Sequence, residues 1–412
     1  MSADLTELLA GPRTVEAAAR VRELVPELRP QPLGLRPSVG LGDRTGLATP
    51  GHVRALRSTG STLAPIFAQQ SIREMERTGR GPGEVMADAT WALLEAGWDQ
   101  PFGADADHLK TTEHIDRCLP HGYTFFTIDP GDHIGSPVPW ERLGDTPRDL
   151  VARLGRPLDL GDRELRPTEA ELLEAAATYG AAAAHVAELY EHLRECAPAG
   201  GFELEVSVDE TDSRTTHAQH VFIADALTRL GVEWISLAPR FVGAFEKGVD
   251  YIGDVGALAD DLAVHAAIAR RLGPYKLSVH SGSDKFSAYS AIAEATSGVL
   301  HLKTAGTSYL EALRAVALHD EPLLRRIYAF ALERFAEDRA TYHLSAGEPG
   351  AGATPDLDDP AARQVLHVTF GSVLASELGH ELRSRLESDL REPYAVALEH
   401  HLGRHVRPFQ SR

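Results

Sequence analysis

The chain has 412 residues, of which 43% are apolar and 25% charged, so it can bury a large core as a globular protein. It carries 60 acidic against 41 basic residues, and the resulting net charge of −19 would repel a phosphate backbone. This charge argues against nucleic-acid binding, and it means that a small anionic substrate would need a local basic pocket.

The cysteines and the N-terminal residues indicate a cytoplasmic protein. Cys118 and Cys196 lie far apart without CxxC spacing, so we expect neither a disulfide framework nor a thiolate zinc site. Residues 1–12 lack the basic start and the long apolar run of a signal peptide. No window approaches the ~20 apolar residues of a membrane span. We therefore expect a reducing compartment and no membrane partner, while the oligomeric state is left open.

In chain order, an amphipathic helix is predicted over residues 14–28, and a proline-rich run at 26–37 ends it. From there on, short apolar or β-branched runs end in polar, glycine-containing turns, and a helical pattern follows each one. The runs are 39–43, 66–70, 102–108, 125–129, 202–210, 234–240, 276–281 and 299–304. Eight strands that are each followed by a helix predict an α/β fold, a (β/α)8 TIM barrel over residues 38–314.

Three helices are especially clear, and a glycine follows each of them; they are predicted at 83–96, 216–230 and 256–272. A last helix is predicted near 393–402. Glycines at these positions end the helices before the next strands begin, which supports the alternating pattern of strands and helices.

The alternation breaks once, after the fourth strand. Residues 135–200 form a long connection that includes a helix at 168–196, and we interpret it as a lid-like insertion over the barrel mouth. Residues 1–37 are predicted as an N-terminal helical segment. Residues 315–412 are predicted as a mainly helical C-terminal extension with a loop at 347–360.

Ionisable and amide side chains collect at nearly every predicted strand end, and in this fold those ends meet at the face that carries catalysis. They are Asp43, Arg44, Gln69, Gln70, Arg73, Asp107, His108, Lys110, Asp129, Asp132, His133, Asp209, Glu210, Arg240, Glu246, His280, Asp284, Lys285, Lys303 and Thr304. A structural protein would have little use for so many polar groups around one mouth. The convergence of the eight ends, rather than any single residue, predicts an active site.

The run at 103–110 is the richest of these ends. Strand alternation places Asp105 and Asp107 on one face and His108 on the other. If the strand ends near Asp107, the turn brings Asp107 and His108 to the same mouth, where they can supply a base and a metal ligand. The alternative is that these residues cap a helix and form surface ion pairs.

Two histidines and one glutamate from three different strand ends form a candidate metal site. A divalent metal in an enzyme needs imidazole nitrogen and carboxylate oxygen, with positions left open for substrate. His108, Glu246 and His280 offer these groups. Nitrogen and oxygen ligands suit zinc, manganese, nickel or cobalt, so the sequence predicts one divalent cation without choosing among these metals.

The other histidines receive structural interpretations. His301 lies inside a predicted strand and is expected to be a core or wall residue. His217 and His220 have the i,i+3 spacing of one helix face, which favours a surface pair over metal ligation. The C-terminal histidines are interpreted as a solvated helix face; they are His400, His401 and His405.

An anion site is predicted where the eighth strand gives way to a helix. Gly306 permits close backbone approach, Thr307 or Ser308 can cap, and free N–H groups attract an anion there, as in many barrels. The turn at 281–285 can add donors. An ordinary helix cap is the alternative interpretation.

The stretches that carry these side chains also resemble a known family. They read GLGDRTGLATPGH (40–52), FAQQSIREM (67–75), GADADHLKT (103–111), FTIDPGDH (126–133), EVSVDET (205–211), SLAPRFVGAFEKGVDYIGD (236–254), HSGSDKFS (280–287) and HLKTAGTSYLEALR (301–314). Together they resemble the tagaturonate/fructuronate epimerases, which are metal-dependent hexuronate C4-epimerases. The connection at 135–200 and the C-terminal tail are weaker matches.

The resemblance implies a divalent metal held by His108, Glu246 and His280, with Asp107 as the base and Glu210 as the acid. Asp209 and Asp129, at the ends of the predicted strands, are near enough to exchange roles with the two glutamates. The expected substrate is a small anionic sugar acid. Its predicted contacts are Gln70, Asp129, Arg240, Lys303, Thr304 and Thr307, with Lys303 and Thr307 holding the carboxylate.

The implied reaction interconverts D-tagaturonate and D-fructuronate by retro-aldol cleavage and re-addition, because the hydrogen on C4 is not α to the ketone. A metal-dependent aldolase or ketose isomerase would share every one of these groups. A non-catalytic sugar-acid-binding protein is the alternative from another class. The acidic pairs argue against it, because buried carboxylates are costly unless they serve chemistry.

Overall fold

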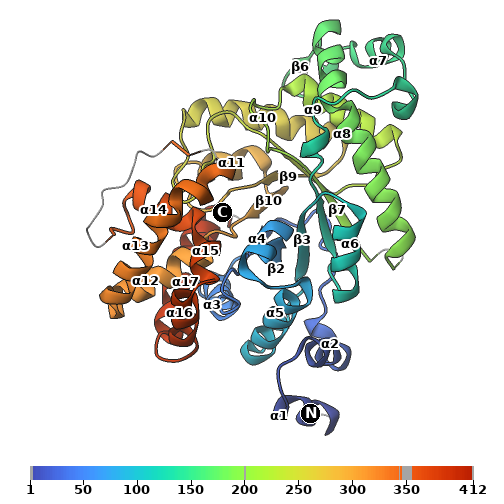
Figure 1. Cartoon of the computed structure of the whole chain (residues 1–412). Helices are drawn as coiled ribbons and strands as arrows, with labels where there is room; N and C mark the ends of the chain where they lie inside the picture. Colours follow the sequence, from blue (N-terminus) through green and yellow to red (C-terminus); the bar gives the residue numbers. More distant parts are fainter. Residues whose placement is uncertain (1–2, 199–200, 343, 346–354, 411–412) are drawn as a thin grey trace.

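Eight parallel strands close into a barrel at the centre of the computed structural model, which describes residues 3–198, 201–342, 344–345 and 355–410 (Figure 1). The strands are β1 (Ser38–Gly40), β2 (Ala64–Ser71), β3 (Gly103–Leu109), β4 (Phe125–Ile128), β7 (Glu203–Val208), β8 (Ser236–Pro239), β9 (Lys276–Val279) and β10 (Leu300–Lys303). Each pairs with its neighbours in chain order, and β1 closes the barrel against β10. The predicted (β/α)8 barrel is confirmed.

A helix follows every strand of the barrel. These helices are α3 (Thr49–Thr59), α5 (Pro82–Ala96), α6 (Thr112–Cys118), α8 (Glu169–Cys196), α9 (His217–Arg229), α10 (Val255–Leu272), α11 (Tyr289–Thr296) and α12 (Thr307–His319), with the short α4 (Ile72–Thr78) directly after β2. Local capping sets the bounds: the side chains of Thr216 and Asp254 accept backbone N–H bonds at the starts of α9 and α10. Gly97 ends α5 with a φ of 57°, which glycine adopts without strain.

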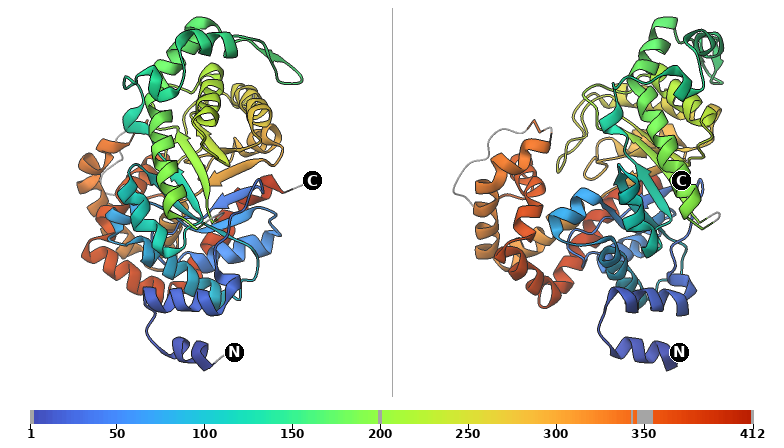
Figure 2. Two further views of the ribbon diagram at one scale, coloured as in Figure 1. Left: turned by 90° about the vertical axis from the view of Figure 1, so that its right-hand side faces the viewer. Right: turned by 45° about the vertical axis from the view of Figure 1, so that its right-hand side comes forward.

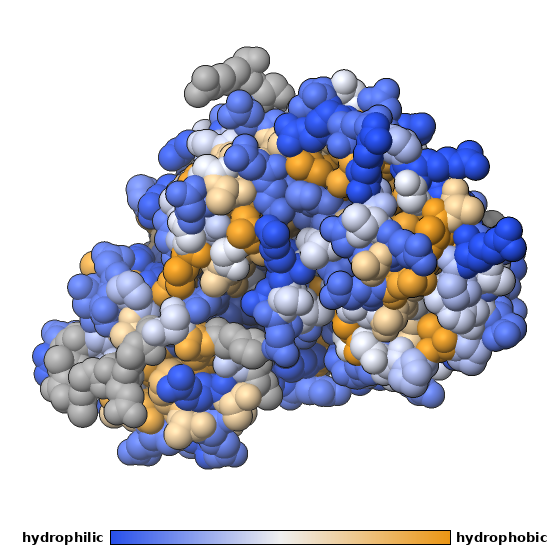
Figure 3. Space-filling view, turned by 90° about the horizontal axis from the view of Figure 1, so that it is seen from above, coloured by the Kyte–Doolittle hydropathy of each residue, from blue (hydrophilic) through white to orange (hydrophobic). Residues whose placement is uncertain are grey.

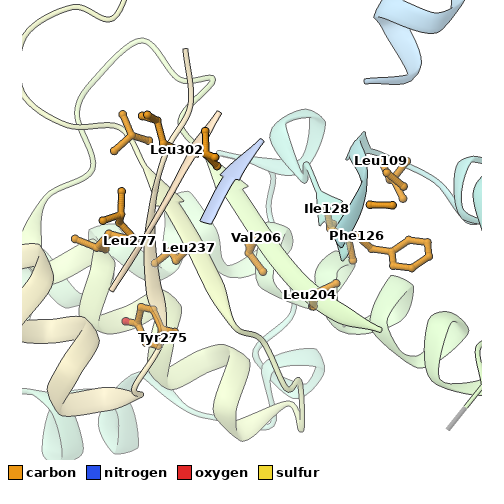
Figure 4. Close-up of a cluster of buried hydrophobic side chains, with 14 of the residues drawn as sticks. Leu109, Phe126, Ile128, Leu204, Val206, Leu237, Tyr275, Leu277 and Leu302 are labelled. Atoms are coloured by element: carbon orange, nitrogen blue, oxygen red, sulfur yellow. The ribbon is translucent and has the colours of Figure 1, made fainter. Parts of the chain in front are cut away.

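The strands are apolar on the outside and polar on the inside of the barrel. In β7 the side chains of Leu204 and Val206 belong to the apolar core, whereas Glu205 and Ser207 are buried polar residues. Outward side chains of neighbouring strands, such as Leu302, meet in the same layer beneath the helices (Figure 4). This alternation follows from the period of two in a strand, and it concentrates charge along the barrel axis.

The connection after β4 lies along the flank of the barrel. It contains α7 (Pro147–Leu154) and a two-stranded hairpin of β5 (Leu158–Asp159) and β6 (Glu164–Leu165), followed by α8. Leu154, Leu158 and Leu165 pack against a small core supplied by α9 and α10, and α7 and β6 lie at the outer end of the molecule (Figure 1). None of the described residues at 135–198 lines the central cavity. They therefore do not cover the mouth in this structure, and closure over the site stays a prediction.

Helices at the two ends of the chain surround the barrel. Their bounds are α1 (Ala3–Ala10), α2 (Val15–Leu24), α13 (Glu321–Asp338), α14 (Pro360–Val368), α15 (Phe370–Leu374), α16 (Glu377–Glu387) and α17 (Arg391–Val406). The helix α2 packs on α5 and is followed by a 3-10 turn at Pro26–Leu28, so the predicted helix over 14–28 ends earlier as α-helix. The predicted loop at 347–360 lies largely outside the described residues, because 346–354 are not among them.

The C-terminal helices form a second apolar core beside the barrel and then return to it. Tyr309, Leu313 and Phe370 are among the buried side chains of this core. From there α17 runs back and packs against α3 and α12, so the helices coloured orange and red lie together on one side of the molecule (Figure 2). The extension is therefore built into the barrel rather than set apart from it.

Seen from above, hydrophilic side chains cover most of the surface and apolar ones occur in small separate groups (Figure 3). The large apolar residues that remain exposed are Leu9, Ile252, Val255, Leu318 and Val396. Scattered exposure of this kind is usual for globular proteins. Among the described helices, none combines the length and the apolar character that crossing a bilayer would require.

Candidate active site

A cavity of about 630 Å³ opens where the strands end, within the size range of small-molecule sites. Each of the eight strands contributes to its lining through its last residues or the loop after it. In strand order from β1 to β10, examples are Arg44, Ser71, His108, Ile134, Glu210, Arg240, Ser281 and Ala305. The predicted convergence of strand ends on one site is confirmed.

Asp107 and His108 reach this cavity together because β3 is irregular at its end. The pairing of β3 with β4 shifts register between Ala106 and Leu109, and His108 takes a left-handed φ of 53°. Such a conformation in a non-glycine residue costs roughly 1–2 kcal/mol and is typical of functional sites. The turn lets Nδ1 of His108 lie 2.8 Å from Oδ1 of Asp107, as the sequence predicts for a strand that ends here.

A second imidazole and a carboxylate complete a compact group around His108. One ligand atom each of His108, Asp209 and His280 lies within 4.8 Å of the others. Nδ1 of His280 is 3.1 Å from Oδ1 of Asp209, while Nε2 of His280 is 2.7 Å from Oε1 of Glu205. Asp107 and Glu205 thus each hold one ring nitrogen of a histidine, as the outer partners of metal-binding histidines do.

The electrostatics of this group suit a bound cation. Burial by itself lowers the pKa of His108, but the neighbouring Asp107 carboxylate overrides it and raises the pKa to about 10. Burial likewise raises the pKa of Asp209, whereas the two imidazoles lower it well below its usual range. A site that holds positive charge so firmly, with imidazole nitrogen and carboxylate oxygen as donors, fits a divalent metal.

Glu246 lines the same cavity but does not join this group. One oxygen of its carboxylate accepts bonds from N and Oγ of Ser345 at 2.8 and 2.9 Å and from Nε2 of Gln364 at 2.8 Å. The structure therefore places Asp209, rather than the predicted ligand Glu246, with the two imidazoles. The geometry thus favours the predicted alternative in which Asp209 takes the role of Glu246 as the carboxylate ligand.

Lys303 lines the cavity and lies at the centre of a buried carboxylate cluster. Its Nζ is 2.5 Å from Oδ1 of Asp107, 2.8 Å from Oε1 of Glu205 and 3.0 Å from Oδ2 of Asp105. Burial lowers the pKa of Lys303, but the three carboxylates raise it well above its usual value. An ammonium group with three anionic partners has no charge left for a substrate carboxylate, so the predicted role of Lys303 does not fit the structure.

The carboxylates of this cluster differ in protonation. Burial raises the pKa of Asp105 to about 7, although Lys303 opposes the shift. Burial would also raise the pKa of Asp107, but His108 and Lys303 hold it well below the usual range. Neighbouring carboxylates with pKa values pushed apart are the usual sign of acid–base chemistry. Asp107 is therefore ionised in the cavity, above an Asp105 that can store a proton.

The two glutamines at the end of β2 point in opposite directions. Nε2 of Gln69 donates to Oδ2 of Asp107 at 2.9 Å, and Gln69 lines the cavity. Gln70 faces away from the cavity and accepts a bond from Arg80 at 3.3 Å. Strand alternation allows only one of the two to face inward, so the prediction of Gln70 as a substrate contact is wrong and Gln69 takes that position.

Two other predicted substrate contacts make local bonds instead and do not line the cavity. Oδ1 of Asp129 accepts the backbone N–H of Gly131 at 2.8 Å, which fixes the turn after β4. Oγ1 of Thr304 donates to the carbonyl of Gly40 at 2.8 Å and joins β10 to β1. Both side chains shape the mouth from below rather than contact a ligand.

The predicted anion site at the start of α12 is only partly open to the cavity, which Gly306 lines but Thr307 does not. Thr307 donates to Ser283 at 3.1 Å, and His367 of α14 packs directly on Gly306, where an added Cβ would lie 2.2 Å from its ring. Burial, followed by the charge of Arg44, lowers the pKa of His367 well below its usual value. A neutral imidazole therefore occupies the space next to Gly306 at the predicted anion site.

A family model described as tagaturonate epimerase matches residues 2–409 of the chain. The chain belongs to the tagaturonate epimerase family. It is 42% identical over 405 residues to the tagaturonate/fructuronate epimerase of Thermotoga maritima, covering 94% of this chain and 83% of that protein. The family resemblance drawn from the sequence motifs is confirmed.

Solved structures agree with this assignment to the tagaturonate epimerase family. A glycerol-complexed crystal structure of the fructuronate-tagaturonate epimerase UxaE from Cohnella laeviribosi superposes with a TM-score of 0.88 at 36% identity, covering 96% of this chain and 86% of that chain. The native crystal structure of the same enzyme gives 0.86 at 35% identity with the same coverage. The barrel and its C-terminal helices are thus those of an epimerase family.

In this member of the tagaturonate epimerase family, two cations remain open to the cavity. Backbone bonds with Thr215 at 2.9 and 3.0 Å hold Arg240 in place, and among the described residues its guanidinium has no ion-pair partner. Within the described ranges, Lys247 donates only to Oγ of Ser281, at 2.6 Å. Arg240 thus lies where the sequence predicted a substrate contact, while Lys247 was missed.

Glu210, the predicted acid of this epimerase site, lies at the rim of the cavity. Its side chain is 40% exposed and approaches Arg73 at 3.4 Å. Burial of the carboxyl would raise its pKa, but His108 and Arg73 lower it below the usual value. The group therefore faces the imidazole group from the solvent side, opposite the buried Asp107.

The loop after β9 is fastened to the C-terminal helices. Asp284 receives Nε2 of His401 at 2.6 Å and a guanidinium nitrogen of Arg363 at 2.9 Å, and its backbone N–H donates to Nε2 of His405 at 2.9 Å. These helices thereby position the segment that begins with His280. Such support is the outer layer on which a precise site depends.

The predictions for the histidines outside the cavity are confirmed in part. His301 is fully buried and bonded to Oγ of Ser38 at 2.9 Å, which confirms its interpretation as a core residue. His401 and His405 are buried, so the solvated-face interpretation is wrong for these two, because α17 turns this side towards the barrel. His220 is also fully buried, so the predicted surface pair is wrong for that residue.

Proposed function

We propose that the protein interconverts D-tagaturonate and D-fructuronate by inverting C4, with the help of one bound divalent metal. The observation that carries the proposal is the ionised Asp107 beside the His108–Asp209–His280 group, in a cavity that also holds the unpaired Arg240. Family membership supports the same reaction, since the Thermotoga relative carries the name of this epimerase. Both cysteines are free thiols, which supports a cytoplasmic location.

Carbon–carbon cleavage explains why a base and a cation are needed together. In these sugar acids the hydrogen on C4 is not α to the C2 ketone, so enolisation cannot invert C4. Removal of the proton from the C4 hydroxyl lets the C3–C4 bond break in a retro-aldol step. The aldehyde half then rotates, and the enolate adds to its other face. A bound divalent metal would supply stabilisation for the negative charge that develops on the enolate half.

The chain's own residues then handle the proton. Asp107 takes the C4 hydroxyl proton, and its geometry is fixed because Lys303 and His108 hold one oxygen while Gln69 holds the other. Glu210, on the solvent side of the cavity, takes a proton from water and passes it to the new alkoxide after rotation, while Asp107 releases the proton it took to solvent. In the reverse direction the two carboxylates exchange roles, so no net proton is gained or lost.

The cations at the rim explain recognition of an acidic sugar. Arg240 and Lys247 line the cavity without a carboxylate partner among the described residues, in a chain whose net charge is −19. We propose that Arg240 binds the substrate carboxylate, because a guanidinium matches a carboxylate with two parallel bonds. Arg240→Met should then raise KM by roughly 10- to 100-fold with a smaller effect on kcat, as expected for a lost charged contact of 1.5–3 kcal/mol.

The metal ligands can be tested separately from the reaction. We propose His108, Asp209 and His280 as the ligands, and Glu246 is the alternative carboxylate because it lines the same cavity. Bound metal should be measured by mass spectrometry after Asp209→Asn and after Glu246→Gln. Metal loss in the first variant alone supports the proposed set, whereas loss in the second alone assigns the carboxylate ligand to Glu246.

The reaction itself is tested by an NMR time course with D-tagaturonate after EDTA treatment and again after zinc, manganese, nickel or cobalt is restored. Metal-dependent appearance of D-fructuronate without fragments supports the epimerase. Asp107→Asn should abolish turnover while the metal content stays unchanged. Release of free aldehyde fragments would instead indicate an aldolase, and metal binding without turnover on either sugar acid would contradict the proposal.

A further inference from the structure

A second group of imidazoles and a carboxylate lies between α9 and α10, away from the cavity. It consists of His217, Asp261 and His265, whose ligand atoms lie within 4.8 Å of one another. Nε2 of His217 is 3.0 Å from Oδ1 of Asp261, and Nε2 of His265 is 3.8 Å from Oδ2 of Asp261. None of the three residues lines the active-site cavity, so the proposed reaction does not use them.

His265 leaves one buried nitrogen without a partner. Its ring is fully buried, and Nδ1 lies 2.7 Å from Nδ1 of His220, whose own Nε2 is 2.8 Å from the hydroxyl of Tyr275. Nε2 of His265 makes no hydrogen bond with any described residue, since the 3.8 Å to Asp261 is too long for one. A buried polar atom of this kind requires an explanation, and a bound ion is one.

We propose that His217, Asp261 and His265 bind a second divalent cation with the ligand preference of zinc. Ligands about 2.0 Å from a tetrahedral metal lie roughly 3.3 Å from one another. The observed separations of 3.0 and 3.8 Å bracket that value, whereas the longer one fits no hydrogen bond. The side chain of His217 is 29% exposed, so solvent can reach the fourth position.

The surroundings of this site support the ligands from outside. The second oxygen of Asp261 accepts the backbone N–H of Val242 at 3.1 Å, and His220 orients the ring of His265. Metal-binding groups usually have such outer partners. Among the described arginines and lysines, only Arg214 approaches Asp261, at 4.0 Å. Its side chain is 59% exposed, so it can turn into solvent when the cation binds.

The cation would fasten two loops of the active-site mouth. The helix that begins at His217 follows the loop carrying Glu210, and Val242 belongs to the loop carrying Arg240. Thr215 and Arg240 already join these loops through two bonds of 2.9 and 3.0 Å. We therefore assign the second cation a structural role, which holds whether or not the proposed sugar is the substrate.

The test is a zinc count on the full-length protein. The purified protein is stripped with a chelator, reloaded with excess Zn²⁺ alone, desalted and analysed by mass spectrometry. The variant His217→Ala should hold one zinc ion per chain fewer than the unmodified protein. The matched control is His185→Ala, which removes another half-buried helical imidazole and should leave the count unchanged. Reloading should also raise the melting temperature of the unmodified protein by more than that of His217→Ala.

A second variant distinguishes loss of the metal site from loss of the folded structure. Asp261→Asn keeps the shape of the side chain and should lose the same zinc ion. An unchanged zinc count in both His217→Ala and Asp261→Asn would overturn the proposal. The active-site cation is counted separately with His280→Ala, so a failure of the proposed epimerase site and a failure of the second site give different patterns of metal loss.

Discussion

Replacement of Lys303 by methionine should destabilise the protein far more than the same change at Lys276, although both lysines are buried in the barrel. Lys303 has carboxylate oxygens of Asp105, Asp107 and Glu205 within 3.0 Å. Removing one side of a buried ion pair leaves its partners uncompensated and typically costs about 3–5 kcal/mol. Lys303→Met should therefore lose at least that much unfolding free energy, together with the activity that depends on Asp107.

Lys276 is the matched control because it makes no ion pair with a carboxylate in the part of the chain that the structure describes. Its Nζ donates to Oγ of Ser38 at 3.2 Å and to the carbonyl of Arg36 at 3.4 Å. Burial lowers the pKa of Lys276 from 10.5 to about 8. Because pH 7 lies below both pKa values, the lysine is charged in the folded and in the unfolded chain, and its burial destabilises the folded protein by about 3 kcal/mol. Methionine removes that cost and loses two weak bonds worth roughly 0.5–1.5 kcal/mol each. Lys276→Met should therefore leave stability unchanged or slightly increased.

The comparison is made by urea unfolding at pH 7, followed by far-UV circular dichroism on the two variants and the unmodified protein. The expected difference between the variants is at least about 3 kcal/mol, with Lys303→Met the less stable. Adding Glu205→Gln to Lys303→Met should recover part of the loss, since the pKa of Glu205 lies well below its usual value and one buried negative charge is removed. Equal stability of the two single variants would refute the view that Lys303 neutralises the carboxylate cluster.

Three further predictions concern pH, substrate size and metal removal. Burial lowers the pKa of His405 to about 3, so below pH 6.5 the unfolded chain binds a proton that the folded chain does not. The protein should therefore lose about 2 kcal/mol of unfolding free energy through this residue between pH 7 and pH 5. The variant His405→Gln, compared by urea unfolding at both pH values, should lack that loss. His367→Ala should uncover the N–H groups at the start of α12 and make inorganic phosphate a competitive inhibitor. For an inhibition constant of ~1 mM, the apparent KM should rise roughly 10-fold at about 10 mM phosphate. The variant His367→Leu, which keeps a larger side chain than alanine at this position, should show no inhibition. EDTA treatment should lower the melting temperature of the unmodified protein, and a smaller decrease is expected for His280→Ala.

Each of these results can also fail in a defined way. A pH dependence of stability that His405→Gln leaves unchanged would mean that the residue is protonated in the folded protein. Phosphate inhibition of both variants at His367, or of neither, would show that the imidazole does not close an anion site. A chelator effect that is identical in the unmodified protein and in His280→Ala would remove that histidine from the metal ligands.

The barrel was predictable because its signals are local and repeated. Each strand is a short run of apolar residues that a turn ends, and the structure places the strands within a few residues of the predicted runs. The same regularity placed Asp107, His108 and Arg240 at the mouth, since the carboxyl ends of all the barrel strands meet at that face. Asp107 and His108 lie on the same side because β3 becomes irregular near its end, where the sequence predicts that the strand stops.

Other parts of the site were missed for two physical reasons. Glu205 and Asp105 lie in the middle of strands, where a charged residue is rare. The alternation of Glu205 and Ser207 in β7 with Asp209 directly after it was the available signal. His367 was different, because no pattern in the sequence determines which C-terminal helix packs on the start of α12. The lysine at 303 was placed correctly but paired wrongly, since its three anionic partners come from distant strands.

The anchoring of Asp284 by His401 and His405 has a consequence for synthesis of the protein on the ribosome. All eight strands have been made once Lys303 has been added, but the helix that holds the loop after β9 comes about 100 residues later. At ~5–20 residues per second this interval is roughly 5–20 s. During that time the surfaces of α3 and α12 that α17 later covers are exposed. A nascent chain of this family should therefore be a better chaperone client just before its last helix emerges than at any earlier point after the barrel strands are complete.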